Sequence, residues 1–288
     1  MKKRRGTRPG ALTLIVALLL LGVASWAGLD VSREFEQLTG IDVRSLSTGS
    51  YTGAPREIAV GDLPQTPDSF GAAKRLLYDE VFADRRSEFY CGCPFDADGR
   101  PDLDACGYAV RGNEQRAGRI EAEHVVPAYW IGHTRTCWRE PICSGRDGRR
   151  FRGRDCCEQV DPVFRTAHND LHNLWPSVGE VNADRSNFRF GMIEGEPRAY
   201  GSCDFEVDGG LRRAEPRPEI RGDIARISFY MERTYGVALS DQQRRLFEAW
   251  NREDPPDAWE IERNERIRRV QGNGNPFVED YGEEVARR

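Results

Sequence analysis

Two stretches decide the fold that we expect, Arg119-Ile-Glu-Ala-Glu-His-Val-Val-Pro-Ala128 and Asp170-Leu-His-Asn-Leu-Trp-Pro-Ser-Val-Gly-Glu-Val-Asn182. The first has enough β-branched and apolar residues to predict a strand over residues 118–126. Pro127 cannot donate a hydrogen bond to a neighbouring strand, so we expect the strand to end near His124.

Two acidic residues and a histidine fall near the end of this predicted strand. Alternation along a strand places Glu121 and Glu123 on one face, and Ala122 and His124 on the other. A local bend next to Pro127 would bring Glu123 and His124 to a common site.

The second stretch predicts a short strand followed by a helix. Residues 171–175 have strand character, and Ser177 followed by Glu180 has the spacing of a capping box. We therefore expect a helix that starts there and runs to about Asn187. Asn182 would lie in its second turn, where asparagine is unfavourable, so its side chain is a candidate functional group.

Residues 128–163, between the two stretches, predict a long irregular insertion held by cysteines. Structureless loops of this length are usually functional or disordered, and the cysteines argue against disorder. Six arginines occur within residues 139–154: Arg139, Arg146, Arg149, Arg150, Arg152 and Arg154. Individually most of them suit a solvated loop, whereas the loop as a whole suits contact with phosphate groups.

These residue types suit the hydrolysis of a phosphodiester. The reaction needs a nucleophilic water, a base that takes its proton, and positive charge on the phosphorane. His124 has a side chain that titrates near neutral pH and suits the base. Glu123 and the amide oxygen of Asn182 suit a hard cation such as Mg²⁺, whose shell is completed by water and phosphate.

His168 and His172 have the four-residue spacing of a zinc-binding helix. No glutamate follows His168 directly, so the metalloprotease pattern is absent. We interpret both histidines as structural.

Residues 1–27 have the pattern of an export signal. A basic segment at residues 2–5 precedes an apolar stretch at residues 11–24, and Ser25 and Ala27 suit cleavage directly after them. The apolar stretch is short for a membrane span, although an uncleaved anchor is a second interpretation. We expect a soluble protein that is periplasmic or secreted and has no membrane partner beyond export.

Eight cysteines suit such a compartment: Cys91, Cys93, Cys106, Cys137, Cys143, Cys156, Cys157 and Cys203. An even number behind an export signal predicts four disulfides. Four bridges allow 105 pairings, and the sequence does not choose among them. A structural zinc site is the alternative, but neither close cysteine pair has the usual two-residue gap.

Composition predicts one globular domain. The chain has 288 residues, of which 39% are hydrophobic, and its net charge of −5 gives no global basic field. Lysine occurs at only three positions, so arginine carries nearly all the positive charge. Residues 28–67 lack periodicity and predict a flexible N-terminal extension, which leaves residues 68–288 as the mature domain.

The rest of the chain predicts mostly helices. Apolar residues recur at helical spacing after Ser69, a suitable N-cap, as far as Phe82. Residues 87–93 predict a short strand. Toward the C-terminus we expect aromatic core residues on three helices: one from Gly222 to Gly236, one capped by Ser240 with Gln243, and one from Asp254 to Gly272.

The two stretches resemble the two signatures of the bacterial endonuclease I family, which are periplasmic and secreted non-specific nucleases. Similarity extends over residues 69–278 and includes Phe89-Tyr-Cys-Gly-Cys93 and Val270-Gln-Gly-Asn-Gly-Asn-Pro-Phe-Val278. Ala122 departs from the family, which often has tryptophan between the two glutamates, but this change removes no proposed ligand.

The resemblance implies an α+β fold, a mixed α/β single domain built around the ββα-metal (His-Me) finger of HNH and Serratia-type nucleases. It implies that His124 is the general base. It also implies that Glu123 and Asn182 bind the divalent ion, which would be Mg²⁺ or another divalent cation such as Mn²⁺ or Ca²⁺.

The resemblance also implies a role for one arginine of the insertion. Arg154 matches the arginine that holds the cleaved phosphate in the family. Because the insertion is longer here, the other candidates for phosphate contact stay open: Arg149, Arg150 and Arg152. Glu121 and Asn173 fall on motif positions with supporting roles.

The resemblance implies a sequence-non-specific endonuclease that cuts double- or single-stranded DNA, and often RNA as well, to leave 5′-phosphates. We expect a monomer by default. Contacts to the nucleic-acid backbone, which carry no sequence information, suit such an activity. One alternative is a secreted nucleic-acid-binding protein of the same fold without cleavage. A disulfide-rich structural or adhesion protein would explain the cysteines and arginines but not the two signatures.

Overall fold

The computed structural model describes residues 58–195 and 198–286. The predicted signal peptide at residues 1–27 and most of the predicted extension at residues 28–67 lie outside the described residues. All described residues belong to the second of two compact units, which begins at Pro55. Within the described part of the chain, no helix has the length and apolar character to cross a membrane.

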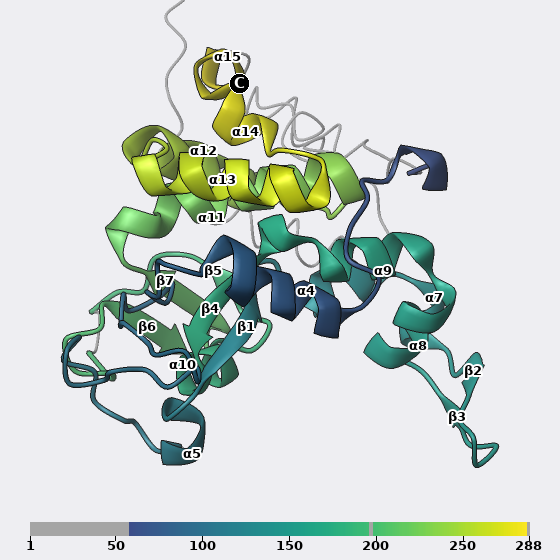
Figure 1. The fold of residues 1–288 in the computed structure, drawn as a ribbon, viewed down its shortest axis with the longest axis horizontal. Coiled ribbons are helices and arrows are strands. Elements are labelled where there is room, and N and C mark those ends of the chain that lie inside the picture. Colours follow the sequence, from purple (N-terminus) through teal and green to yellow (C-terminus); the bar gives the residue numbers. More distant parts are fainter. Residues whose placement is uncertain (1–57, 196–197, 287–288) are drawn as a thin grey trace, which may run out of the picture. The chain divides into compact units, whose positions relative to one another are not determined.

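Two antiparallel strands and the helix that follows them form the centre of the fold (Figure 1). β1 (Ile120–His124) pairs with β4 (Leu174–Val178), and His124 lies opposite Leu174. α10 (Gly179–Arg185) starts directly after β4. This ββα unit within a mixed α+β chain confirms the predicted fold class.

β4 begins later than the strand predicted at residues 171–175. Leu171–Asn173 instead form a 3₁₀ turn, η3, because the Asp170 carboxylate accepts a hydrogen bond from the backbone of His172. The apolar residues around this turn are buried in the same core as the strand, so hydrophobicity alone does not separate the two.

The predicted capping box does not form at the start of α10. Ser177 lies inside β4, and its hydroxyl donates to the carbonyl of Val178. The carboxylate of Glu180 accepts hydrogen bonds from the backbone amides of residues 111–113 instead. α10 therefore begins without a side-chain cap, and it ends before Ser186, which has a φ of 51°.

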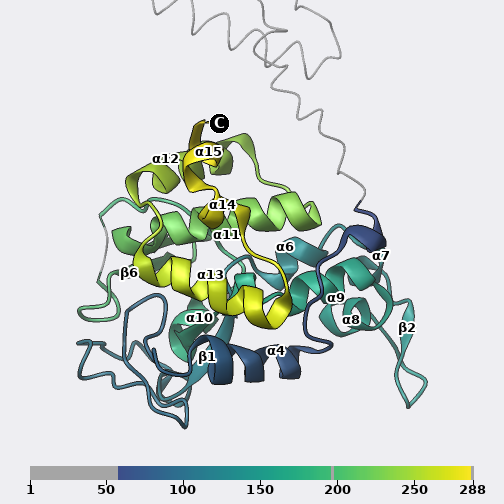
Figure 2. The same ribbon diagram turned by 45° about the horizontal axis from the view of Figure 1, so that its top comes forward.

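Residues 128–163 are more regular than predicted. They include three short helices and a hairpin: α6 (Ala128–Gly132), α7 (Thr136–Arg139), β2 (Cys143–Ser144), β3 (Arg150–Phe151) and α8 (Arg154–Val160). Figures 1 and 2 show the β2–β3 hairpin extending away from α8. The prediction of an irregular insertion is wrong, because helices of four to seven residues leave little periodic signal.

Four disulfides confirm the interpretation of the cysteines. They are Cys91–Cys203, Cys93–Cys106, Cys137–Cys157 and Cys143–Cys156. The last two tie α7 and β2 to α8, in which Cys156 and Cys157 are both buried. Every cysteine sulfur is therefore in a disulfide, which excludes the zinc alternative at these positions.

The first long helix begins where the sequence predicts it. α4 (Phe70–Leu76) is capped by Ser69, whose hydroxyl accepts a hydrogen bond from the backbone of Ala72. The helix continues directly into a π-helical turn, η2 (Leu77–Val81). This turn ends close to the limit predicted at Phe82.

The strand predicted at residues 87–93 does not form. Ser87 makes only an isolated bridge with Pro94. The carboxylate of Glu88 accepts hydrogen bonds from the backbone amides of three residues in a tight turn: Tyr90, Cys91 and Cys93. The prediction is wrong because a buried side chain, and not a neighbouring strand, satisfies these amides.

The C-terminal part of the described chain is helical. Its elements are α11 (Arg221–Tyr235), α12 (Asp241–Glu253), α13 (Ala258–Gln271), α14 (Pro276–Glu279) and α15 (Tyr281–Ala286). Figures 1 and 2 show α11, α12 and α13 together on one side of the β1–β4 pair. Gly236 and Gly272 end α11 and α13 in left-handed conformations, as predicted. Ser240 caps α12 as predicted, whereas Asp257 and not Asp254 caps α13.

The remaining elements are short. They are η1 (Val60–Asp62), α5 (Glu114–Ala117), α9 (Pro162–Asn169), β5 (Arg189–Phe190), β6 (Phe205–Asp208), β7 (Arg213–Pro216) and η4 (Pro218–Ile220). β5, β7 and β6 form a three-stranded sheet in that order, which the sequence does not indicate.

Aromatic residues join the C-terminal helices to the central unit. Phe82 packs edge-on against both Trp175 of β4 and Trp259 of α13, with ring centroids 5.5 and 5.3 Å away. Trp250 and Phe247 of α12 are also buried. The prediction that the C-terminal aromatics belong to the core is confirmed, and they pack against β4 through Trp175.

Candidate active site

A cavity of about 820 Å³ lies where β1, α4, α6, α8 and α10 meet. Five of the predicted site residues line it: Glu121, Glu123, His124, Arg154 and Asn182. The other predicted residues do not. Asn173 is buried behind the strands, and three arginines lie on or beside the β2–β3 hairpin: Arg149, Arg150 and Arg152.

The His124 ring is held in one tautomer. Its Nε2 lies 2.8 Å from the carbonyl oxygen of His168, and because a carbonyl only accepts, Nε2 must carry the proton. Nδ1 is therefore the unprotonated nitrogen. The ring of Phe70 stacks on His124 at 5.1 Å, and the His168 ring lies 4.5 Å away, so the imidazole is fixed in position.

The surroundings of His124 favour its neutral form. Burial lowers the pKa of His124 well below its usual value, and the neighbouring His168, Arg154 and Arg185 lower it further. The hydrogen bond to the His168 carbonyl only partly opposes this shift. At neutral pH the imidazole is thus a free base.

His168 and His172 have different positions. His172 is buried and lies 3.0 Å from the carbonyl of Asn273, in keeping with a structural role. The His168 ring packs against the His124 ring. The Nδ1 of His168 lies 2.7 Å from a carboxylate oxygen of Glu158 on α8. The spacing of the two histidines gave no sign that one of them touches the proposed base.

Glu123 is a buried carboxylate with two defined side-chain partners. Its Oε1 accepts hydrogen bonds from the Tyr90 hydroxyl at 2.8 Å and from Arg185 at 2.9 Å. Burial raises the pKa of Glu123, and the charge of Arg185 opposes that rise. The backbone amide of His124 also hydrogen-bonds to the carboxylate, and Glu123 lines the cavity, so this carboxylate is the candidate anionic ligand for a cation.

Arg185 was not predicted as a site residue, yet it holds the end of β1. It is buried, and besides Glu123 it donates to the backbone carbonyls of His124 and Val125. An arginine in the last turn of a helix is also what the helix dipole favours, so the sequence pattern alone does not mark this residue.

Asn182 and Glu121 form a second polar group at the cavity. The Asn182 amide donates to Glu121 Oε2 at 2.9 Å, which leaves the Asn182 carbonyl oxygen for another ligand. Glu121 also pairs with Arg116 and Arg119, so its own oxygens are occupied. Gly179 allows α10 to approach this group, since a Cβ there would lie 2.6 Å from the carbonyl oxygen of Arg116.

Asn173 has the supporting geometry that its motif position predicts. Its amide oxygen accepts from the backbone nitrogen of Val126 at 2.7 Å, and its amide nitrogen donates to the carbonyl of Val126 at 2.9 Å. This pair of bonds fixes the chain directly after β1, where the sequence predicts a bend. Glu123 and His124 both reach the cavity from there.

The available donors fit a hard divalent cation. The Glu123 carboxylate and the carbonyl oxygen of Asn182 are oxygen ligands of the kind that Mg²⁺ prefers. A third of the coordination shell or less would come from the protein, which is usual where water and phosphate complete the shell. These two residues are the candidates to hold the metal.

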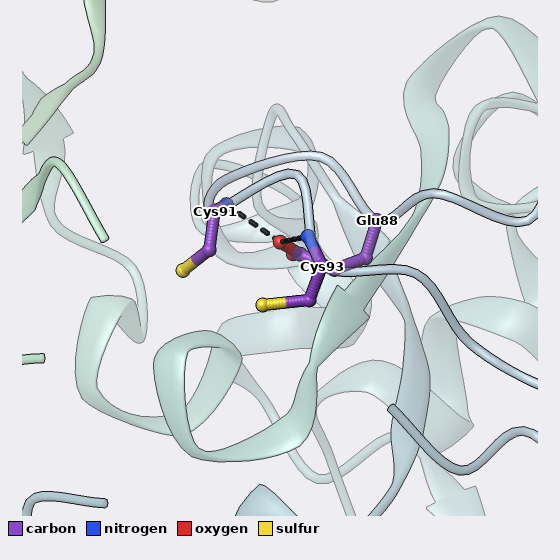
Figure 3. A group of neighbouring side chains, drawn as sticks. All are labelled: Glu88, Cys91 and Cys93. Carbon is purple, nitrogen blue, oxygen red and sulfur yellow. Dashed lines mark hydrogen bonds between the residues drawn. The ribbon is translucent and has the colours of Figure 1, made fainter. Parts of the chain in front are cut away.

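A second grouping of potential ligands is structural. Glu88, Cys91 and Cys93 place three ligand atoms within 4.8 Å of one another. Figure 3 shows the Glu88 carboxylate hydrogen-bonded to the backbone nitrogens of both cysteines. Both sulfurs are in disulfides, so neither is a thiolate that could bind a metal.

Arg154 is the arginine of the insertion that lines the cavity. It is the first residue of α8 and follows Gly153, whose φ of 95° turns the chain into the helix. The side chain is exposed. Among the described arginines of the insertion, Arg150 and Arg152 donate to backbone carbonyls within the insertion instead.

The chain is also similar in sequence to known proteins. The family model described as Endonuclease I matches residues 78–281. An extracellular deoxyribonuclease of Aeromonas hydrophila is 45% identical over 221 residues, which are 75% of this chain and 92% of that protein. A periplasmic deoxyribonuclease of the same organism is 44% identical over 75% of this chain and 87% of its own length. Endonuclease-1 of Buchnera aphidicola is 39% identical, over 74% of this chain and 82% of its own length.

Proposed function

Since this chain belongs to the endonuclease I family, we propose that it is an endonuclease that hydrolyses the phosphodiester bonds of DNA without sequence preference. One observation supports the proposal most. His124, fixed with Nδ1 unprotonated, lines the same cavity as the two oxygen ligands Glu123 and Asn182. A base and a cation site are thereby brought to one place.

The first step that we propose belongs to His124. Its Nδ1 takes a proton from a water molecule, and the oxygen of that water attacks the phosphorus atom. The bond from phosphorus to the 3′ oxygen then breaks, the 3′ oxygen takes a proton from a second water molecule to become a hydroxyl, and the phosphate stays on the 5′ side. The His168 carbonyl stabilises the imidazolium that forms, because the Nε2 proton already points at it.

The charged groups around His124 have separate roles in the rest of the proposed reaction. A bound divalent cation, Mg²⁺ in our proposal, would supply positive charge to the phosphate oxygens and the leaving oxygen. Glu123 and Asn182 hold and orient that cation. Arg154 contacts the cleaved phosphate from the α8 side, and Arg149, Arg150 and Arg152 contact the nucleic-acid backbone further along.

The proposed setting is outside the cytoplasm. The four disulfides and the relatives named extracellular and periplasmic agree with a periplasmic or secreted protein. We propose that residues 1–27 are the export signal and that residues 68–288 are the catalytic domain of a monomer. We also propose that RNA is a substrate, since backbone contacts do not read the base.

A plasmid assay tests the proposal. Oxidised protein that lacks residues 1–27 should cut plasmid DNA with Mg²⁺ and not with EDTA. His124→Ala should lower the rate by roughly a hundredfold or more under conditions in which circular dichroism shows the variant to be folded. Cutting that survives the substitution would contradict the mechanism, and a gel shift without any cutting would favour the binding protein over the enzyme.

Calorimetry tests the cation site apart from activity. Glu123→Gln should weaken the binding of Mn²⁺ or Mg²⁺ to the protein by about tenfold or more, because a neutral amide replaces the charged ligand. Glu114→Gln, an exposed glutamate on α5, is the matched control and should leave binding unchanged. Equal affinity in both variants would mean that the cation binds elsewhere.

A further inference from the structure

An aromatic surface lies in the wall of the cavity, and the proposed hydrolysis does not use it. Tyr129 of α6 and Trp138 of α7 line the cavity together with Arg154. Tyr129 is 36% exposed, and Trp138 is half-buried. The two rings lie 6.1 Å apart at 79° to one another.

The Tyr129 ring is held in place from within α6. The His133 ring stacks almost parallel to it, with centroids 5.0 Å apart and planes 17° apart. His133 lies one helical turn after Tyr129. Its Nδ1 lies 3.1 Å from the backbone carbonyl of Tyr129, and this contact holds the two rings against each other. The tyrosine therefore loses little conformational freedom when something binds to it.

The Trp138 ring is held just as firmly. It lies against Gly132, where a Cβ would approach the indole to 2.2 Å, so only glycine permits the contact. Its other neighbour is Phe164 of α9, with ring centroids 5.8 Å apart. The aromatic wall is thus built on a rigid base and does not depend on a mobile loop.

Cationic side chains line the same cavity as this wall. They are Lys74, Arg154, and Arg116 and Arg119, which also pair with Glu121, and such cations suit a phosphate backbone. A groove that combines positive charge with aromatic rings is typical of proteins that bind single strands, because unpaired bases stack on the rings. In a duplex the faces of the bases are covered by their neighbours, so a ring in the wall has nothing to stack on.

We propose that Tyr129, with Trp138 beside it, is a stacking subsite for the base of an unpaired nucleotide. The subsite makes the protein prefer single-stranded nucleic acid to a duplex of the same sequence. It is tolerant of sequence, since every base has a face that can stack. The inference rests on one part of the proposed function, namely that the cavity binds nucleic acid.

Binding to a variant that cannot cut tests the subsite. In protein that carries His124→Ala, Tyr129→Leu should raise the Kd of a single-stranded oligonucleotide by about tenfold or more. The Kd of the matching duplex should change by less than about twofold, because no base stacks there. Tyr129→Phe keeps the ring and should restore the single-strand affinity. Tyr281→Leu, on α15 and outside the cavity lining, is the matched control.

A second measurement needs no change at Tyr129. An oligonucleotide with 2-aminopurine in place of one base should lose fluorescence on binding, because stacking on an aromatic ring quenches it. Equal loss of affinity for single strand and duplex in Tyr129→Leu, or no quenching, would overturn the inference. Cleavage of plasmid by the unsubstituted protein is a separate result, so a failed stacking test leaves the proposed hydrolysis standing.

Discussion

Arg185 is the residue on which both the proposed base and the proposed metal ligand depend. It binds Glu123 Oε1 and the carbonyl of His124 with one nitrogen, and the carbonyl of Val125 with the other. We predict that Arg185→Met destabilises the protein by about 3–5 kcal/mol, because a buried carboxylate loses its partner. Urea unfolding measures the change.

A milder substitution separates folding from activity at this position. Arg185→Lys keeps the charge but cannot reach all three acceptors. We expect it to fold and to cut DNA roughly 10–100 times more slowly, since the support of the metal ligand is lost. Arg245→Lys, on the exposed side of α12, is the control and should cut at the original rate. Normal cutting by Arg185→Lys would show that the arginine only stabilises the fold.

At this scale the sequence predicts the residues of the motif but not those that hold them. His124, Glu123 and Asn182 stand in two recognisable stretches, and the structure brings all three to one cavity. Arg185 reaches a carbonyl 60 residues earlier in the chain, and no local pattern records such a contact. The ring of His168 beside His124 was missed for the same reason.

At the scale of elements, the close approach of α10 to α5 and to Glu121 of β1 requires a residue without a Cβ at Gly179. A Cβ at Gly179 would meet the Arg116 carbonyl oxygen at 2.6 Å and the Glu121 carboxylate at 2.9 Å. We predict that Gly179→Ala costs about 1–3 kcal/mol of stability and displaces Asn182, which lowers the cutting rate.

A glycine in another helix provides the control for this prediction. At Gly71 in α4, a Cβ would meet only ordinary contacts at 3.9 Å. Gly71→Ala should be neutral or stabilise by at most about 1 kcal/mol, because alanine favours the helix. If both substitutions had the same effect on thermal unfolding, the close approach of α10 would not explain Gly179.

The contact between Glu158 of α8 and His168 of α9 should contribute a stability that depends on pH. A hydrogen bond from His168 lowers the pKa of Glu158 from its usual value of 4.5, against the opposing effect of burial. An acid with a lowered folded-state pKa stabilises the protein above its unfolded pKa, and this contribution is lost as the pH falls through the folded value. We predict that Glu158→Gln is less stable than the original protein at pH 7 and that the difference shrinks below pH 4.5. A constant difference across that range in urea unfolding would contradict the link.

Element limits are predicted best where the signal is local. The caps at Ser69, Ser240 and Gly236 depend on residues within one turn, and all three are confirmed. The capping box predicted at Ser177 does not form, because the Glu180 carboxylate accepts hydrogen bonds from backbone amides 67 to 69 residues earlier in the chain. A pattern cannot show that a distant backbone competes for the same carboxylate.

At the scale of the whole molecule, the disulfides differ in what they constrain. Cys91–Cys203 joins residues 112 apart, whereas Cys93–Cys106 joins residues 13 apart. In the chain-entropy treatment these bridges stabilise by roughly 5 and 3 kcal/mol. Double substitution to serine should therefore cost more for the long bridge in urea unfolding. Equal losses would mean that strain or residual structure dominates.

Reduction should abolish cutting as well as stability. Two bridges hold α8, and α8 carries Arg154 at the cavity. We expect protein treated with dithiothreitol to lose plasmid cleavage and to regain it on reoxidation. Full activity of a reduced sample would mean that the bridges are not needed to hold α8 at the cavity.

The pairing of Cys91 with Cys203 also affects how the disulfides form after export. An exported chain emerges from its N-terminus, so Cys91 and Cys93 meet Cys106 long before Cys203 is available. If Cys93 pairs with Cys106 first, Cys91 keeps its thiol until Cys203 appears, but a Cys91 that pairs with an earlier cysteine must be released by thiol–disulfide exchange. We therefore predict that the active protein matures faster in a host with a disulfide isomerase than in one without it, because uncatalysed reshuffling takes seconds to hours.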